Sequence, residues 1–422
     1  MVINRVGRVA WVLVGVIGFA SARADVLGSA PPEAEGFSAE RLGRLSTALE
    51  AYVESEQLAG SVTLVARNGR IVFLEAHGAR DRASNAPMQV DTIFRIASQS
   101  KAIVSTAIMM LQEAGELLIT DPVGDYIPEF SETSVAVARE DGGYDVVPAS
   151  RRITIRDLLT HTSGYDYGAG VAADQWQAAG ITGYYFSDRS EPILDTVRRM
   201  ASLPASAHPG TQWIYGYNTD ILGAVVEVAS GMPLDRFLDE RIFTPLGMDD
   251  TNFYLPGSDA DRLATVYAAQ DGDLVRAPET GGAGQGAFLD GPRESFSGGA
   301  GLLSTAEDYA SCLQMILDGG ALNGQRLLSR KSVELMGASH LGDLEFRPGV
   351  GFGLGFSVVE DLGERGTLGS VGELAWAGAY HSTYWIDPLE ALVVVHLTQL
   401  IPTGGVDDHD KLRTLIYQAI AD

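Results

Sequence analysis

The stretch "DTIFRIASQSKAIVSTAIMMLQEAG" (residues 91–115) places a serine and a lysine three positions apart, where an extended segment gives way to a helical one. Residues at that spacing on a helix lie on one face, so Ser98 and Lys101 are expected to face each other. A serine hydroxyl is a weak nucleophile until a neighbouring base takes its proton, and a lysine with a lowered pKa is such a base. The residues after Lys101 are apolar, which is unusual around a solvated charge. Taken alone, the motif fits a helix-capping serine and a surface lysine better.

Composition limits the classes of partner. The chain has 422 residues, 45% of them hydrophobic, which is ample for a large core. It carries 30 Lys and Arg against 55 Asp and Glu, a formal net charge of −25. Such a surface repels phosphate backbones and anionic membranes. We therefore expect no nucleic-acid partner, and no feature of the sequence specifies an oligomeric state.

The N-terminus has the order of a secretory signal. Arg5 and Arg8 precede an apolar run over residues 9–20, and "ARA" ends at Ala24. We predict a signal peptide over residues 1–24, with cleavage after Ala22 as a second option. The alternative is an uncleaved anchor, although the run is short for a span of about 20 residues. The protein is thus expected to be exported, periplasmic or secreted, without stable membrane insertion after cleavage.

Nothing in the sequence indicates a metal or a cofactor. The histidines show neither H-x-H nor H-E-x-x-H spacing, and His161 in "LLTHTSG" is predicted to hold a loop together. The lone cysteine, Cys312, is interpreted as a small buried hydrophobe. The glycine-rich residues 281–301 are predicted to form a mobile connection or a loop. They do not follow a strand and open a helix as a phosphate loop does, so we expect no nucleotide binding.

The two ends of the chain read as parts of one sheet. A helix capped by Ser38 is followed by two β-rich runs around Asn68-Gly69, a strong hairpin signal. "STYWIDP" and "ALVVVHLTQ" predict another antiparallel pair, with a helix from about His409. We expect a sheet subdomain from about 25–95 and 300–422, and an inserted helical subdomain from about 96–299.

Two further stretches bring chemistry to the Ser–Lys pair. In "HPGTQWIYGYNTDILG" (208–223), Tyr215 precedes a helix, and a tyrosine near an ammonium can relay protons. In "LAWAGAYHSTYWIDP" (374–388), Gly378 allows close approach to a strand whose N–H groups could bind an oxyanion. Each has a simpler alternative, an aromatic core residue and a bulged edge strand. No G-x-S-x-G is present, which argues against an α/β-hydrolase.

Together these stretches resemble the serine β-lactamase and penicillin-binding-protein-like hydrolases, and most closely the class C β-lactamase-like esterases called family VIII carboxylesterases. The likeness runs over nearly the whole mature chain. It rests on "EGFSAERLGRL", "GSVTLVARNGRIV", "DTIFRIASQSKAIVS", "ITIRDLLTHTSGY", "PGTQWIYGYNTDILG", "SGGAGLLSTAEDYA" and "WAGAYHSTYWIDP". The resemblance implies an α/β (α+β) fold of β-lactamase type, with an antiparallel sheet flanked by helices and an inserted mainly helical domain.

The resemblance also implies roles. Ser98 would be the acylated nucleophile, Lys101 its base partner, and Tyr215 the proton shuttle to the leaving group. Trp376, Ala377 and Gly378 would stand at the motif that reads K-T-G in antibiotic-hydrolysing enzymes and W-x-G in many esterases. The oxyanion would be bound by the N–H groups of Ser98 and Ala379.

Several positions depart from the pattern or stay open. Trp376 replaces the lysine that grips a β-lactam carboxylate, which favours uncharged esters. Asn218 comes one residue later than the asparagine of Y-x-N, so we assign it no role. His381 either narrows the acyl pocket and donates to substrate, or is a strand-end histidine in solvent. The aromatic insert, namely Trp176, Tyr184, Tyr185 and Phe186, either walls the cleft or packs under a loop.

These observations favour an exported serine hydrolase that cleaves small-molecule carboxylic esters. The alternatives are a β-lactamase or D-Ala-D-Ala peptidase and, less favoured, a non-catalytic binding protein on the same scaffold.

Overall fold

The computed structural model describes residues 26–422. The predicted signal peptide and its cleavage site lie outside these residues. Within the described part, no helix combines the length and the apolar character needed to cross a membrane.

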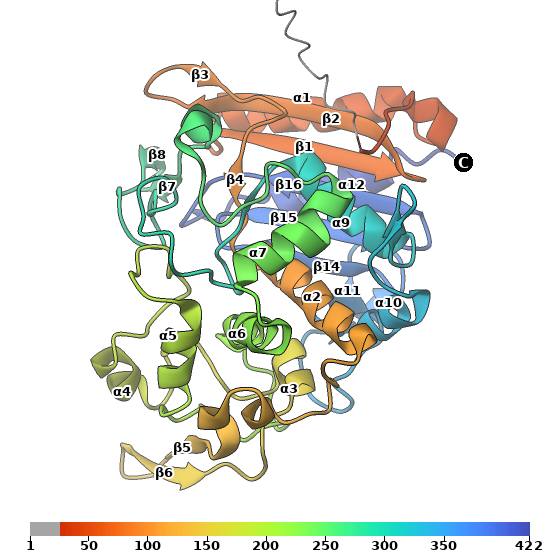
Figure 1. The fold of residues 1–422 in the computed structure, drawn as a ribbon. Coiled ribbons are helices and arrows are strands. Elements are labelled where there is room, and N and C mark those ends of the chain that lie inside the picture. The colour runs from red at the N-terminus through yellow and green to blue at the C-terminus, as the bar shows by residue number, and fades with distance from the viewer. Residues whose placement is uncertain (1–25) are drawn as a thin grey trace, which may run out of the picture.

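An eight-stranded antiparallel sheet forms the body of the molecule, and its centre joins the two ends of the chain (Figure 1). β1 pairs with β2 through the Asn68-Gly69 turn and with β16 on its other side, in a register that sets Leu64 opposite Val395. β15 also pairs antiparallel with β16, with Tyr384 opposite Val395, so both predicted hairpins are confirmed. In spatial order the strands are β12 (Val350–Phe352), β13 (Ser357–Val359), β14 (Leu374–Gly378), β15 (Ser382–Asp387), β16 (Leu392–Leu397), β1 (Gly60–Arg67), β2 (Arg70–Asp81) and β3 (Ala86–Pro87).

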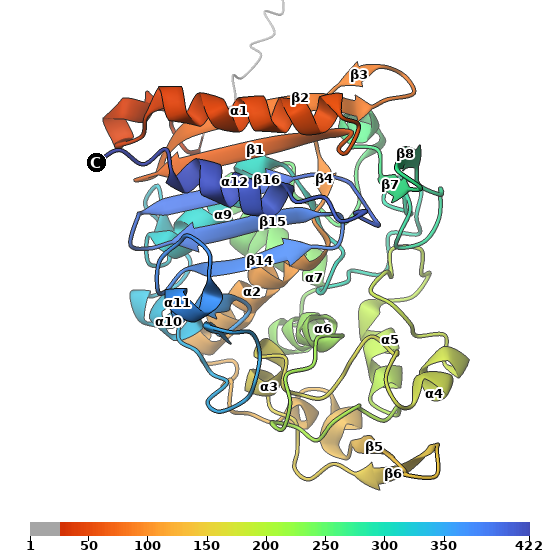
Figure 2. The same ribbon diagram turned by 180° about the vertical axis from the view of Figure 1, so that it is seen from behind.

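Helices cover both faces of this sheet, which is why every residue of β1 and β16 is buried. α1 (Ala39–Glu54) and α12 (Asp408–Tyr417) lie on one face (Figure 2). As predicted, Ser38 caps α1 by accepting from the Arg41 N–H. α9 (Ala306–Leu317) packs on the opposite face and contains Cys312, which is 1% exposed. Burial raises the pKa of this thiol to about 12, in keeping with a small hydrophobe.

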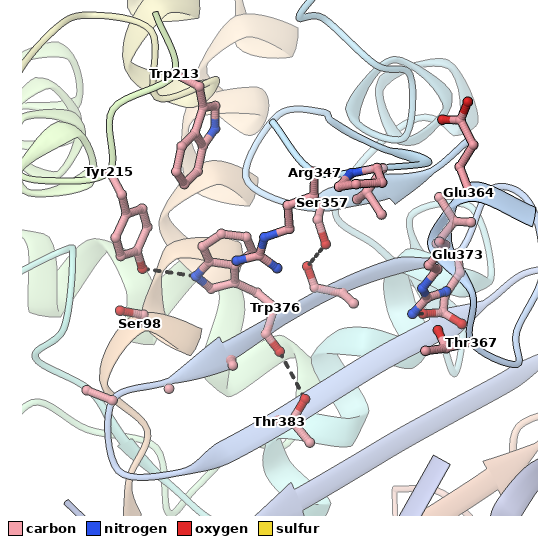
Figure 3. Close-up of a pocket in the computed structure, with 18 of the residues that line it drawn as sticks. Ser98, Trp213, Tyr215, Arg347, Ser357, Glu364, Thr367, Glu373, Trp376 and Thr383 are labelled. Carbon is pink, nitrogen blue, oxygen red and sulfur yellow. Dashed lines mark hydrogen bonds and ion pairs between the residues drawn. The ribbon is translucent and has the colours of Figure 1, made fainter. Parts of the chain in front are cut away.

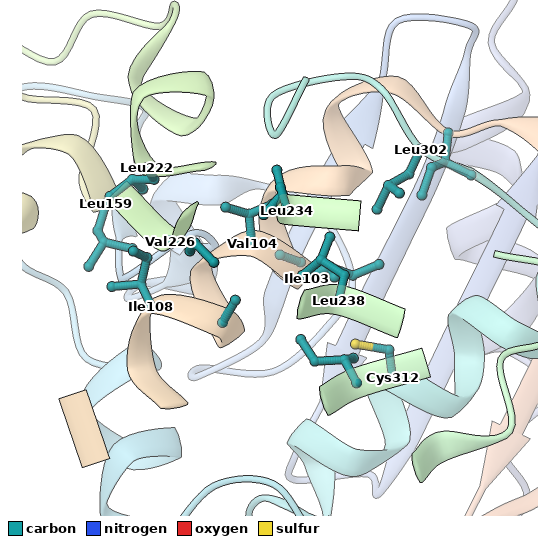
Figure 4. Close-up of a cluster of buried hydrophobic side chains, with 14 of the residues drawn as sticks. Ile103, Val104, Ile108, Leu159, Leu222, Val226, Leu234, Leu238, Leu302 and Cys312 are labelled. Atoms are coloured by element: carbon teal, nitrogen blue, oxygen red, sulfur yellow. The ribbon is translucent and has the colours of Figure 1, made fainter. Parts of the chain in front are cut away.

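α2 (Ser100–Ala114) runs between the sheet and the helical part of the molecule (Figure 1). Its apolar side chains, Ile103, Val104 and Ile108 among them, belong to the same buried cluster as Leu222 and Val226 of α6 (Figure 4). The core thus fixes α2, and with it the first turn that carries Lys101. The other helices are α3 (Ile155–Leu159), α4 (Ala173–Ala178), α5 (Ile193–Met200), α6 (Asn218–Ser230), α7 (Leu234–Leu238), α8 (Thr244–Leu246), α10 (Arg330–Met336) and α11 (Leu362–Arg365).

Short pairs of strands and single turns complete the described fold. One pair, β4 (Phe94–Arg95) with β9 (Leu303–Ser304), leads directly into the turn that carries Ser98. The remaining pairs are β5 (Ser134–Ala138) with β6 (Tyr144–Pro148), β7 (Tyr267–Gln270) with β8 (Asp273–Arg276), and β10 (Ala321–Leu322) with β11 (Gln325–Arg326). The short turns are η1 (Pro32–Glu35), η2 (Ala97–Gln99), η3 (Val123–Asp125), η4 (Pro128–Ser131), η5 (Asp239–Phe243) and η6 (Gly257–Arg262).

Candidate active site

Ser98 stands on a turn, not on the helix itself. It lies in η2, and α2 begins two residues later at Ser100 without a side-chain cap. The preceding Ala97 has φ 44°, a left-handed conformation that is unfavourable for a residue with a Cβ. Lys101 Nζ lies 3.2 Å from Ser98 Oγ, and the two residues are 2% and 8% exposed. The sequence therefore predicts their juxtaposition correctly, but Ser98 does not cap the helix.

The buried Lys101 amine has two more polar partners, which the sequence analysis missed. Its Nζ donates to the carbonyl oxygen of Gly299 at 2.7 Å and to Tyr167 Oη at 3.1 Å. Among the described residues no carboxylate lies within 4 Å of it. Burial, followed by the neighbouring Tyr215 and Asp220, raises the pKa of the Tyr167 phenol well above its ordinary value. Tyr167 is therefore neutral and can both accept and donate a hydrogen bond.

Gly299 is held in place by a buried carboxylate. Asp220, on the first turn of α6, accepts from the Gly299 N–H at 3.1 Å and from Ser297 Oγ at 2.6 Å. A Cβ on Gly299 would lie 2.4 Å from Asp220 Oδ2, so the contact requires glycine. Burial raises the pKa of Asp220, opposed by these bonds and by Lys101. The glycine-rich segment is thus a loop, one of the two forms predicted for it, and its end at Gly299 is a fixed part of the site.

Tyr215 lies on the other side of the Lys101 amine. Lys101 Nζ is 4.7 Å from the centroid of the Tyr215 ring, which is within cation–π distance. Tyr215 Oη accepts from Trp376 Nε1 at 2.9 Å (Figure 3). Trp213 stacks on Tyr215 with centroids 5.8 Å apart and an angle of 8° between the rings. The structure thus brings Ser98, Lys101, Tyr215 and Trp376 together, and orients Tyr215 through Trp376.

The end of β14 reaches the Ser98 turn because Gly378 has no side chain. A Cβ there would lie 2.6 Å from the carbonyl oxygen of Ile96, two residues before Ser98. The next N–H, that of Ala379, donates to no acceptor within residues 26–422. The turn that contains it is closed by the His381 N–H, which donates to the Gly378 carbonyl at 3.2 Å. A free N–H at this position suits the predicted oxyanion site.

His381 is turned away from the pocket that contains Ser98. Its Nε2 lies 2.5 Å from Asp408 Oδ1, and it is absent from the pocket lining. This placement differs from both sequence interpretations, because the ring neither narrows the acyl pocket nor faces open solvent. Thr398 Oγ1 contacts the His381 carbonyl at 2.7 Å and that of Tyr380 at 3.0 Å, so the turn is held from behind.

The pocket above Ser98 has a volume of about 800 Å³, and aromatic rings form much of its wall (Figure 3). Arg347 extends over it, with its guanidinium carbon 5.3 Å from the Trp376 ring centroid. Within the described residues no carboxylate lies within 4 Å of Arg347. Trp376 therefore stands where the motif lysine would be, but Arg347 still places a positive charge over the pocket. The sequence analysis missed this residue. Its lining includes Ser98, Tyr167, Tyr184, Trp213, Tyr215, Arg347, Trp376 and Ala379.

The aromatic insert is divided between the two roles considered for it. Tyr184 lines the pocket. Trp176 and Phe186 are 2% and 1% exposed and pack on Tyr217, with the Trp176 ring stacked at 5.4 Å. Tyr185 is not part of this pocket lining. Its hydroxyl oxygen accepts a hydrogen bond from the Ala287 N–H at 2.5 Å. One of the four residues walls the cleft.

His161 and Asn218 join the loops beneath Tyr215. Asn218 Nδ2 lies 2.9 Å from His161 Nδ1 and donates to the Ile214 carbonyl at 3.2 Å. His161 is 1% exposed, and burial together with the Lys101 charge holds the pKa of its imidazole well below its ordinary value. Its ring centroid is 4.8 Å from that of Tyr215. A neutral, buried His161 that supports a loop agrees with the sequence interpretation.

Comparison with known proteins gives a consistent assignment. The family model described as Beta-lactamase matches residues 45–418. The chain is 34% identical over 387 residues to esterase EstB of Burkholderia gladioli, covering 87% of this chain and 92% of EstB. The solved structure titled EstCE1, "a hydrolase with promiscuous acyltransferase activity", has a TM-score of 0.77 at 30% identity, covering 89% of this chain and 98% of EstCE1. Simvastatin synthase (LovD) of Aspergillus terreus has a TM-score of 0.75 at 25% identity, covering 90% and 98% of the two chains.

Fold, site and relatives define a serine hydrolase with the β-lactamase fold. The chain belongs to the Beta-lactamase family, and its relatives include esterases that act on small-molecule esters.

Proposed function

We propose that this protein cleaves carboxylic esters through an acyl-enzyme on Ser98. The observation that carries the proposal is the 3.2 Å contact between Ser98 Oγ and the buried Lys101 amine at the floor of an aromatic pocket. The buried amine lies within hydrogen-bond reach of the hydroxyl whose proton has to leave, which is the geometry required of a general base. The similarity to EstB and EstCE1 supports an ester as substrate.

The proposed reaction proceeds in two balanced halves. The Lys101 amine takes the Ser98 proton while Ser98 Oγ bonds to the ester carbonyl carbon, and the N–H groups of Ser98 and Ala379 bind the oxyanion. The intermediate collapses by breaking the bond to the alcohol, which takes a proton from the Lys101 ammonium through Tyr215. Water then adds to the carbonyl carbon of the acyl-enzyme and gives a proton to Lys101 through Tyr215. The bond between that carbon and Ser98 Oγ breaks, Ser98 Oγ takes the proton from Lys101, and the carboxylic acid leaves.

A fluorophosphonate probe tests the nucleophile. We expect intact-mass analysis to show one adduct on the wild type, one on Ser105→Ala, and none on Ser98→Ala. Ser105 is a matched control because it is also a buried serine and lies on α2, the helix that follows the Ser98 turn. A wild type that forms no adduct would favour the non-catalytic binding protein, and an adduct that survives Ser98→Ala would assign the nucleophile elsewhere.

Lys101→Ala tests the base. We expect turnover of p-nitrophenyl butyrate to fall by at least about 100-fold, in line with the loss of a general base, while thermal unfolding stays cooperative. Near-normal turnover in a folded Lys101→Ala protein would overturn the Ser–Lys mechanism.

Substrate class is tested by comparing p-nitrophenyl butyrate with nitrocefin and a D-Ala-D-Ala peptide. We expect the ester to have the highest kcat/KM. Comparable turnover of nitrocefin or of the peptide would favour the β-lactamase or peptidase alternative, to which the Arg347 cation would then contribute.

We also propose that the protein is exported, because residues 1–24 have the order of a signal peptide. Expression in a Gram-negative host, followed by fractionation, tests this. N-terminal sequencing of the periplasmic protein is expected to begin at Asp25. Retention of the full-length chain in the membrane fraction would support the uncleaved anchor instead.

A further inference from the structure

Three histidines and one aspartate meet behind the turn that carries Ala379. His381 belongs to that turn, His396 lies on β16, and Asp408 and His409 form the first turn of α12. His396 and Asp408 are 0% and 1% exposed, while His381 and His409 are half-buried and adjoin the surface. The group is separate from the substrate pocket, whose lining contains none of these four residues.

The potential ligand atoms converge. One such atom from each of His381, Asp408 and His409 lies within 4.8 Å of the others. His381 Nε2 is 2.5 Å from Asp408 Oδ1. Ligand atoms about 2.0–2.2 Å from a tetrahedral zinc are roughly 3.4 Å apart. Closing the widest separation takes a movement of about 0.7 Å by each of two atoms, and the His381 and His409 rings, which stack at 4.1 Å with 10° between their planes, also have to turn towards the ion.

The surroundings resemble the outer shell of a metal site. A ligating histidine usually donates its second ring nitrogen to an oxygen, which fixes its orientation. His409 Nε2 lies 3.2 Å from the His381 carbonyl oxygen, which leaves His409 Nδ1 for a ligand. Behind them, His396 Nδ1 lies 2.7 Å from Thr63 Oγ1, and its Nε2 faces Asp408 Oδ2 at 3.4 Å.

One buried oxygen in this group has no hydrogen bond. Asp408 Oδ2 is fully buried yet finds no donor with suitable geometry within the described residues. Buried carboxylate oxygens are normally hydrogen-bonded or bound to a cation, because burial without either is costly. His396 Nε2 faces this oxygen at 3.4 Å without hydrogen-bond geometry, so the oxygen is loosely paired with an imidazole and can still accept a better-placed cation.

We propose that His381, Asp408 and His409 bind a divalent cation of the zinc class, with water as the fourth ligand. The donor set of two imidazoles and one carboxylate suits Zn²⁺ and Co²⁺ and leaves one open position. Binding breaks the His381–Asp408 contact and releases any proton shared between them. The sequence analysis expected no metal, because the three ligands come from two segments whose spacing matches no linear motif.

Cobalt titration tests the site. Tag-free, full-length Ser98→Ala protein is stripped with a chelator and titrated with Co²⁺, so that the result does not depend on the proposed esterase activity. We expect one Co²⁺ per chain, visible absorption typical of four-coordinate cobalt, and displacement of Co²⁺ by Zn²⁺. The absence of saturable binding would overturn the proposal.

Variants locate the bound ion. We expect His409→Ala to weaken Co²⁺ binding by more than the roughly 10–100-fold that loss of an outer-shell partner costs. His381→Ala is expected to do the same, whereas His340→Ala, a histidine outside the group, retains wild-type affinity. Circular dichroism melting shows whether each variant is folded. Unchanged affinity in folded His409→Ala and His381→Ala proteins would place the ion elsewhere and contradict the proposal.

Discussion

Two tyrosines flank the one buried amine of the candidate site, and they contact it in different ways. Tyr167 Oη accepts a hydrogen bond from Lys101 Nζ at 3.1 Å, whereas Tyr215 presents the face of its ring at 4.7 Å. The Tyr215 hydroxyl is instead fixed by Trp376 Nε1 at 2.9 Å. Only one hydroxyl is needed to carry a proton to the leaving group, so the two residues are expected to differ in effect when the hydroxyl is removed.

We predict that Tyr215→Phe lowers kcat by about 10²–10⁴-fold, as expected for loss of a proton-transfer group. Tyr167→Phe is expected to cost about 10-fold or less, because Lys101 keeps Ser98 Oγ and the Gly299 carbonyl as partners. Steady-state kinetics with p-nitrophenyl butyrate measures both variants. The reverse order of effects would assign the shuttle to Tyr167.

Arg347 supplies a positive charge over the pocket that the missing motif lysine would otherwise provide. We predict that Arg347→Met lowers kcat/KM for an anionic ester, mono-p-nitrophenyl glutarate, by about 10-fold relative to neutral p-nitrophenyl butyrate, the scale of a partly screened charge pair. High salt is expected to reduce the difference in the wild-type protein. An equal effect on both esters would mean that Arg347 acts by packing on Trp376 and not by charge.

At the scale of elements, contacts between residues that are close in sequence could be predicted, whereas contacts made by distant loops could not. Ser98 and Lys101 are one helical turn apart, so their contact follows from the sequence, as do the hairpin turn at Asn68-Gly69 and the Ser38 cap. Tyr167 and Gly299 reach Lys101 from loops 66 and 198 residues away, and only the packing of α2 and α6 sets their positions. The landmark "THTSGY" ends at Tyr165, two residues before Tyr167, and nothing in it indicates a contact with Lys101. The orientation of His381 depends on its contact with Asp408 at the start of α12; the sequence predicts this helix, but no local pattern indicates the contact.

Gly378, at the end of β14, allows the turn that contains Ala379 to approach Ser98. We predict that Gly378→Ala lowers kcat by about 10²–10³-fold, the usual cost of a lost oxyanion donor, because the new Cβ would displace either β14 or Ile96. Gly43→Ala is the control, since a Cβ on this α1 residue meets no atom within 4 Å. Kinetics and thermal melting are compared for both. A Gly378→Ala enzyme with wild-type kcat would contradict the proposed role of the Ala379 N–H.

For the molecule as a whole, the large number of carboxylates makes the free energy of unfolding depend on pH. With a formal net charge of −25, the folded protein relies on arginines to hold many of its carboxylates. Glu191, which precedes α5, accepts from Arg199 Nη1 at 2.8 Å. The Arg199 hydrogen bond is the main cause that lowers the pKa of Glu191 from 4.5 to about 2. A depressed pKa in the folded state adds stability above the unfolded pKa, and this contribution is lost as the pH falls from about 4.5 through about 2.

We predict that Glu191→Gln lowers the free energy of unfolding at pH 7 by about 1–3 kcal/mol, with the upper value set by the pKa difference and the lower by solvent screening. The difference from wild type is expected to shrink as the pH falls towards 3. Urea denaturation at several pH values measures it, with the exposed Glu132→Gln as control. A deficit that stays constant with pH would mean that the variant loses packing and not an ionised carboxylate.

The pairing of β1 with β16 has a consequence for the order in which the molecule can form. β1 leaves the ribosome early, but its neighbour β16 spans Leu392–Leu397, close to the end of the chain. Until those residues are made, the most buried strand of the sheet has one edge without hydrogen-bond partners. The sheet therefore closes only after residues 392–397 have been made, and a chain that stops before residue 392 lacks the strand that pairs with this edge of β1.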